Sequence, residues 1–86
     1  MRVHNVEVGK LNLSKIQDII RFIQIINQQE GDYVLQHNTT EVNAKSIMGI
    51  YSLNLEKDVS LIAKKAKKSK IKKLADVLKE ANLLKI

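Results

Sequence analysis

Ser46 is the residue of this sequence whose type and position best suit a defined chemistry. The segment 46–53 is expected to form a short, weak helix with Ser46 at its N-cap. A phosphate on a serine there would meet free backbone N–H groups and the positive end of the helix dipole, and Lys45 would add a cation beside it. On spacing alone, helix capping is the favoured explanation for a serine at this position.

The rest of the sequence offers no catalytic or metal-binding cluster. It contains no cysteine, and its two histidines, His4 and His37, are too few for a metal site. It also lacks paired carboxylates at a suggestive spacing, a glycine-rich phosphate loop and a Ser-His-acid arrangement. We therefore expect neither enzyme activity nor a bound cofactor or metal ion.

Lysine is concentrated near the C-terminal end of the sequence. The formal net charge is +6, and residues 64–86 hold nine lysines against only two carboxylates. The segment 64–73 could neutralise several nucleic-acid phosphates. Its candidate anion-binding residues are Lys64, Lys65, Lys67 and Lys68. Lysine reads bases poorly, and one Phe, two Tyr and no Trp leave little for base stacking. A solvated face is the simpler interpretation, nucleic-acid binding is the alternative, and a membrane-surface role ranks below both.

The spacing of apolar residues predicts the elements that would hold these groups. Residues 2–8 alternate loosely and carry three valines, which indicates a strand that ends at Gly9. Across 15–27, isoleucines spaced by three and four predict an amphipathic helix. Its apolar face consists of Ile16, Ile19, Ile20, Ile23 and Ile26. Ser14 and Gln17 have the spacing of a capping box, which we expect to start this helix.

A hairpin, a further strand and a final helix complete the pattern. Turn residues around 38–40 separate short strands at 33–35 and 41–43. Residues 59–63 form the strongest predicted strand, and a helix capped by Ser69 is expected to run to about residue 84. The order β-α-β-β-α-β-α predicts one α+β domain over the whole chain, with a four-stranded antiparallel sheet covered on one face by helices.

No segment of the sequence is suited to a membrane or to export. The N-terminal residues contain no apolar run of signal-peptide length, and no apolar stretch approaches the ~20 residues needed to span a bilayer. A cytoplasmic protein is expected.

The segment from Val42 to Leu53 resembles the regulatory segment of HPr, the histidine-containing phosphocarrier of the bacterial sugar phosphotransferase system, and of its catabolite-repression paralogue Crh. Chain length and element order also agree with this family, whose fold is an open-faced β-sandwich. In the family this serine is phosphorylated by an ATP-dependent HPr kinase, and the phosphorylated protein binds a transcription regulator as corepressor. The resemblance implies that role for Ser46. It implies partner contacts for Lys45, Ile47, Met48 and Tyr51.

The chain departs from the family at the phosphocarrier motif, which reads Gly-Leu/Ile-His-Ala-Arg-Pro. The matching positions here are Leu13-Ser14-Lys15-Ile16-Gln17-Asp18, which puts Lys15 at the histidine position and Gln17 at the arginine position. A protonated lysine has no lone pair with which to accept a phosphoryl group. His4 cannot replace the histidine, because it lies about ten residues before the helix, roughly 20 Å or more along an extended strand.

Loss of the histidine with retention of the serine segment has a precedent in Crh. We therefore predict an HPr-like regulatory protein-interaction module, a monomer or weak dimer, that does not carry phosphate on histidine. The predicted first helix would offer a partner Lys15, Arg21 and Phe22.

Overall fold

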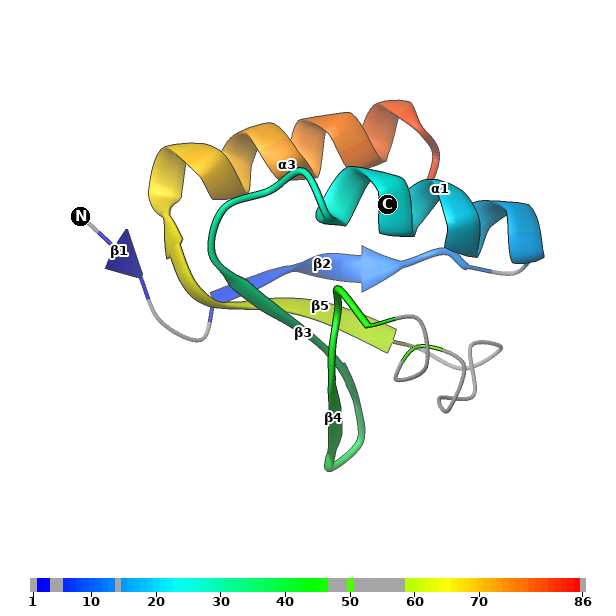
Figure 1. Ribbon diagram of the computed structural model, residues 1–86, viewed down its shortest axis with the longest axis horizontal. Coiled ribbons are helices and arrows are strands. Elements are labelled where there is room, and N and C mark those ends of the chain that lie inside the picture. The colour runs from blue at the N-terminus through cyan, green and yellow to red at the C-terminus, as the bar shows by residue number, and fades with distance from the viewer. Residues whose placement is uncertain (1, 4–5, 14, 47–49, 51–58, 86) are drawn as a thin grey trace.

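In the computed structural model, the described part of the chain has four antiparallel strands in one sheet and two helices on one side of it (Figure 1). The structure describes residues 2–3, 6–13, 15–46, 50 and 59–85. The central strand β5 (Val59–Lys67) pairs with β3 (Asp32–His37), which pairs in turn with β4 (Thr40–Asn43). The α+β class, the four-stranded antiparallel sheet and the hairpin around residues 38 and 39 are thereby confirmed.

The other edge of β5 is occupied by β1 (Arg2–Val3) and β2 (Val6–Leu11), which act as one strand of the sheet. The register that pairs Val3 with Ala66 continues unchanged into β2. Along the sheet the order is therefore β1/β2, β5, β3 and β4, so strands next to one another in space are not always consecutive in sequence.

Gly9 does not end the first strand, contrary to expectation. The register against β5 shifts at Gly9, and β2 continues to Leu11, which forms an isolated antiparallel bridge with Leu84. A Cβ atom at Gly9 would lie 3.1 Å from Cδ2 of Leu84. Glycine at this position therefore allows the C-terminal segment to pack closely against the strand, which is a packing role rather than a turn.

Helix α1 (Ile16–Ile26) lies where it was predicted but is rotated about its axis. Ile19, Phe22 and Ile26 are buried, whereas Ile16 and Ile20 are 61% and 49% exposed. The isoleucine stripe is wide enough to allow several rotations. The one observed encloses the aromatic ring of Phe22, which has the largest apolar surface on the helix and is fully buried.

Helix α3 (Lys68–Glu80) follows β5 directly, so Ser69 is not its cap. The N-cap residue is Lys67, whose side chain makes no capping hydrogen bond. β5 runs beyond the predicted residue 63 because both neighbouring strands continue to pair with it, through Asp32 opposite Lys65 and Arg2 opposite Lys67. Strand pairing thus prevents Ser69 from serving as the start of the helix.

The last helix ends four residues before the predicted position, at a Schellman motif. Asn82 adopts a left-handed φ of 62°. The Leu83 N–H donates to the Leu78 carbonyl at 2.8 Å, and the Asn82 N–H donates to the Lys79 carbonyl at 3.0 Å. This reversal buries Leu83 and Leu84 and directs them onto β2.

The predicted order β-α-β-β-α-β-α is not the one that the described residues show, which is β-α-β-β-β-α. The difference is the short helix expected at 46–53, most of which lies outside the described residues. Of this segment only Ser46 and Ile50 are described, and the Ile50 N–H donates to the Ser46 carbonyl at 3.0 Å, the bond of a single helical turn.

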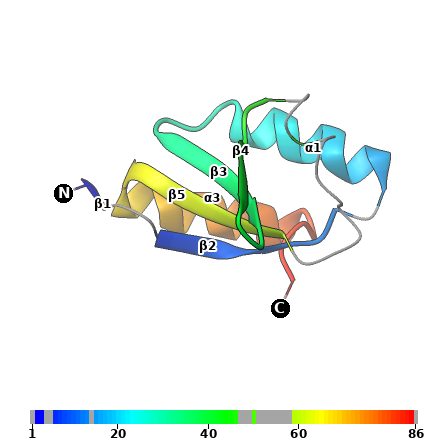
Figure 2. The same ribbon diagram turned by 90° about the horizontal axis from the view of Figure 1, so that it is seen from below.

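The hydrophobic core lies between the sheet and the two helices, whose arrangement over the strands is visible from below in Figure 2. Alternation along β3 and β5 sends every second side chain into this layer. Its fully buried members from the sheet and helices include Phe22, Ile26, Leu35, Leu61, Leu74 and Leu78. The core therefore fixes the relative positions of α1, α3 and the sheet.

Candidate functional site

The turn that leads to Ser46 is held by three hydrogen bonds. The Asn43 side-chain Oδ1 accepts from the Lys45 N–H at 2.8 Å, and the Asn43 carbonyl accepts from the Ser46 N–H at 3.1 Å. The Ala44 N–H donates to the Tyr33 carbonyl at 3.0 Å, which extends the pairing of β4 with β3. An Asx-turn of this kind fixes the backbone direction, so Ser46 is presented from an ordered turn.

Ser46 lies half-buried at the position that the sequence predicts for a helix N-cap. Its carbonyl accepts the helical bond from Ile50, as an N-cap carbonyl does. The other predicted contact residues of this segment, Ile47, Met48 and Tyr51, lie outside the described residues. The local geometry is thus compatible with a helix that starts at Ser46.

Lys45 is engaged with the backbone and is not simply a cation beside Ser46. Its Nζ donates to the Gln29 carbonyl at 2.6 Å and to the Gly31 carbonyl at 3.2 Å. These carbonyls belong to the connection between α1 and β3, so Lys45 ties that connection to the Ser46 turn. Sequence reasoning missed this role, because nothing in the spacing of residues 29, 31 and 45 indicates that they meet.

Gly31 allows the α1–β3 connection to pass close to β5. Its φ is +111°, a conformation that L side chains rarely adopt. A Cβ atom at Gly31 would lie 2.4 Å from the Lys65 carbonyl oxygen. Gly31, whose carbonyl is one of the two that Lys45 binds, therefore cannot be replaced by another residue unless the backbone of this connection rearranges.

The leading end of α1 carries a lysine and a carboxylate where a phosphocarrier needs an imidazole. Lys15 is the N-cap residue and is exposed, and its N–H donates to Oδ2 of Asp18 at 3.3 Å. The Asp18 carboxylate therefore interacts with the positive end of the helix, where it would also repel an incoming phosphoryl group. The prediction that Ser14 and Gln17 form the capping box of this helix is wrong. The N-cap residue is Lys15, and the side chain that accepts from its N–H is Asp18. Ser14 itself lies outside the described residues.

His37, the histidine that the structure describes, does not lie on α1. His37 ends β3 at the hairpin, where its Nε2 lies 3.5 Å from Nδ2 of Asn38. His4 lies outside the described residues.

The exposed side of α1 combines apolar and basic residues. Ile16 and Ile20 lie one helical turn apart and are both exposed, and the cations Lys15 and Arg21 beside them are exposed as well. Phe22, which the sequence suggested as a contact for a partner, is fully buried and unable to serve as one. The partner-accessible apolar residues of α1 are therefore the two isoleucines.

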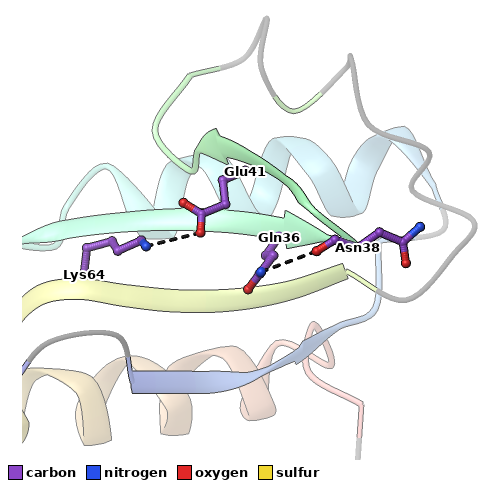
Figure 3. Close-up of polar contacts among 4 residues, drawn as sticks. All are labelled: Gln36, Asn38, Glu41 and Lys64. Carbon is purple, nitrogen blue, oxygen red and sulfur yellow. Dashed lines mark hydrogen bonds and ion pairs between the residues drawn. The ribbon is translucent and has the colours of Figure 1, made fainter.

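The candidate anion-binding lysines gather where β5 meets α3. Lys65, Lys67 and Lys68 are exposed, and Lys65 and Lys67 line a hollow of about 290 Å³ together with Lys70. Lys64 lies on the uncovered face of the sheet, where its Nζ is 3.2 Å from Oε2 of Glu41 on β4 (Figure 3). Of the four predicted lysines, Lys64 therefore pairs with a residue of β4, and the other three lie around the start of α3.

Tyr33 is an unexpected buried polar residue on β3. Its side chain is 2% exposed, and its hydroxyl has no hydrogen-bond partner among the described residues. Burial raises the pKa of the Tyr33 phenol above its ordinary value. The alternation of β3 predicts that Tyr33 faces inward, but it does not reveal that the hydroxyl lacks a partner.

Neither a metal site nor a membrane span is found in the described part of the chain. No three His, Cys, Asp or Glu side chains among these residues could hold a metal ion together, and no helix there is long and apolar enough to cross a membrane. No family model, curated protein or solved structure matches the chain.

Proposed function

We propose that this chain is an HPr-like regulatory module that binds a protein partner, is switched by phosphorylation of Ser46 and does not relay phosphate through histidine. The sequence resemblance at residues 42–53 suggests the switch. The single observation that carries the binding role is the exposure of Ile16 and Ile20 on α1, next to Lys15 and Arg21. Exposed apolar residues with a charged rim are typical of a protein-docking surface.

The fold is compatible with this proposal. An antiparallel sheet with helices on one side is the architecture expected of an open-faced β-sandwich of the HPr type. The helix that would complete the family's element order starts, in this proposal, at Ser46, whose carbonyl already accepts the bond from Ile50. A phosphate on Ser46 would then lie at the start of that helix.

The negative part of the proposal rests on the leading end of α1. Phosphoryl transfer to a histidine needs a neutral ring nitrogen and positive groups that hold the phosphoryl oxygens. Lys15 supplies an ammonium, and Asp18 supplies a negative charge within the same turn. In this proposal the first helix has retained its position in the fold and lost the carrier chemistry.

The switch is tested by incubating the protein with an HPr kinase and labelled ATP. We expect one phosphate per chain, abolished in Ser46→Ala and retained in Ser69→Ala, a matched change at an exposed serine on α3. Absence of label on the wild-type protein, or label retained by Ser46→Ala, would contradict the proposal. A parallel incubation with phosphoenolpyruvate and the general phosphotransferase enzyme should leave the protein unlabelled, and an acid-labile phosphoprotein would overturn the negative part.

The docking surface is tested by measuring how the phosphorylated protein binds the transcription regulator of the HPr family. We expect Ile16→Ser with Ile20→Ser to weaken binding at least about tenfold, since truncation of central apolar contacts commonly costs more than 1 kcal/mol each. Val77→Ser is the matched control, because Val77 is 43% exposed but lies on α3. Equal affinities for the double variant and the wild type would remove α1 from the interface.

A further inference from the structure

Seven lysines surround the junction of β5 and α3, and no acidic residue separates them in the sequence. They are Lys64, Lys65, Lys67, Lys68, Lys70, Lys72 and Lys73. The junction has no loop, because α3 begins at the residue that follows β5. The backbone around it is fixed by pairing of Asp32 with Lys65 and of Arg2 with Lys67. The charges are therefore attached to a rigid corner and not to a flexible tail.

The distribution of charge along α3 differs from that of an ordinary solvated helix. The segment 68–73 holds four lysines and no carboxylate, whereas 74–80 holds Lys79 against Asp76 and Glu80. A face that is merely solvated has no reason to collect its cations at one end of the helix. The excess of charge belongs to the corner where β5 meets the helix.

The helix dipole makes this placement unfavourable for folding. The first turn of α3 contains no acidic residue, and the side chain of its N-cap residue, Lys67, makes no capping hydrogen bond. Cations at this end are repelled by the positive end of the dipole, and the same lysines would stabilise the helix if they stood at its C-terminal end. An anion bound at the corner would relieve both the repulsion among the lysines and the repulsion by the dipole.

Nearby carboxylates neutralise only part of the corner. Glu41 pairs with Lys64, and Glu30 and Asp32 line the hollow that Lys65 and Lys70 share. The exposed lysines that begin α3 and follow along its first two turns lie beyond that hollow. They are Lys68, Lys72 and Lys73. A positive excess therefore remains on the helix side of the corner.

The corner suits a ligand that is recognised by its phosphates and not by its bases. Phe22 and Tyr33, the two aromatic residues that the structure describes, are buried in the core and cannot stack on a base. The lysines of the corner act as point charges and do not form the bidentate contacts that read base edges.

From these observations we propose that the β5–α3 corner binds the phosphodiester backbone of nucleic acid without sequence preference. This inference is independent of the proposed role of Ser46 and of α1. If the six lysines other than Lys64 each contact a phosphate, log K should fall against log salt with a slope of about −5 on duplex DNA. Between 50 and 200 mM salt the affinity should then drop roughly 10³-fold.

The test uses the full chain, a labelled 20-base-pair duplex of mixed sequence, a single-stranded RNA of the same length and fluorescence anisotropy. The corner variant is Lys67→Gln, Lys68→Gln and Lys70→Gln together. Its control, with the same change of net charge, combines Lys10→Gln, Lys79→Gln and Lys85→Gln at exposed sites away from the corner. We expect the wild type to bind duplex at 50 mM salt, and the corner variant to bind at least tenfold more weakly with a salt slope smaller by about three. The control should change affinity about twofold or less.

Thermal unfolding separates a binding defect from a folding defect. The corner variant should melt at a temperature equal to or higher than the wild type, since it removes cations from the positive end of α3. The proposal is overturned by no binding at 50 mM salt, by equal losses in the two triple variants, or by binding to anionic phospholipid vesicles with none to either nucleic acid. A preference for duplex DNA or for RNA would identify the source of the phosphodiester, and either preference supports the proposal.

Discussion

Tyr33→Phe is expected to stabilise the protein. The side chain is 2% exposed, so the phenol leaves water almost completely on folding, and its hydroxyl finds no hydrogen-bond partner in the part of the chain that the structure describes. A buried hydroxyl without a hydrogen bond costs roughly 1–3 kcal/mol. Phenylalanine keeps the ring and its packing and removes that cost, so we expect a gain of about 1–2 kcal/mol. For a domain of this size, 1 kcal/mol corresponds to about 4–8 °C in melting temperature.

The measurement is urea unfolding followed by circular dichroism, with thermal melts in parallel. Phe22→Tyr is the reciprocal control, because it adds a hydroxyl to a ring that is fully buried and should destabilise by a similar amount. If Tyr33→Phe instead lowered stability by the ~1 kcal/mol of a typical hydrogen bond, the hydroxyl would have a partner in solution and the reasoning would fail.

Titration gives the same prediction a second readout. Burial raises the pKa of Tyr33 above its ordinary 10.0, so the unfolded chain releases the phenolic proton at a lower pH than the folded chain does. The contribution of Tyr33 to stability is therefore constant below about pH 10 and is lost as the pH rises through the folded-state pKa. As the pH rises above about 10, the wild type should lose stability more steeply than Tyr33→Phe does. Parallel pH profiles for the two proteins would contradict the burial of the phenol.

Substitutions at three further positions test the connection after α1 and the C-terminal end of α3. Lys45→Met, which keeps the aliphatic stem, should cost about 1–3 kcal/mol in urea unfolding, because two backbone carbonyls lose a charged donor; an unchanged midpoint would mean that water replaces Nζ freely. Gly31→Ala should cost at least ~2 kcal/mol, since a methyl group at φ +111° meets the Lys65 carbonyl, and a neutral result would require a different turn. Asn82→Ala should cost roughly 0.5–1 kcal/mol and Asn82→Gly should be neutral or stabilising, as thermal melts can show; the reverse order would argue against the left-handed C-terminal cap.

The parts of the fold that the sequence predicts well are those governed by local periodicity. The helix over 15–27 and the hairpin at 38–40 follow from spacing and turn residues that act within a few positions. The ends of β5 and α3 do not, because they depend on pairing with residues far away in sequence. Lys65 and Lys67 are strand residues only because Asp32 and Arg2 pair with them.

The same distinction explains what was missed at the candidate site. The sequence predicts Ser46 as a helix N-cap, and its carbonyl accepts a helical hydrogen bond from the Ile50 N–H. The rotation of α1 about its axis cannot be predicted from the sequence, because a stripe of five isoleucines allows more than one face of the helix to be buried. The face that is buried is the one that carries the ring of Phe22. Of the residues that the sequence suggested as partner contacts on α1, Lys15 and Arg21 are exposed, whereas Phe22 is buried and cannot be reached.

The contacts of Lys45 bear on how a phosphate at Ser46 would act. Lys45 Nζ is 2.6 Å from the Gln29 carbonyl, so its charge is already used to hold the connection after α1. A phosphate on the neighbouring serine would compete for that ammonium, because a dianion attracts it more strongly than a neutral carbonyl does. Phosphorylation of Ser46 would then weaken the hydrogen bonds by which Lys45 holds the connection between α1 and β3. A switch of this kind needs the lysine as much as the serine, so Lys45→Met should uncouple phosphorylation from any change in amide-exchange protection at residues 29–31.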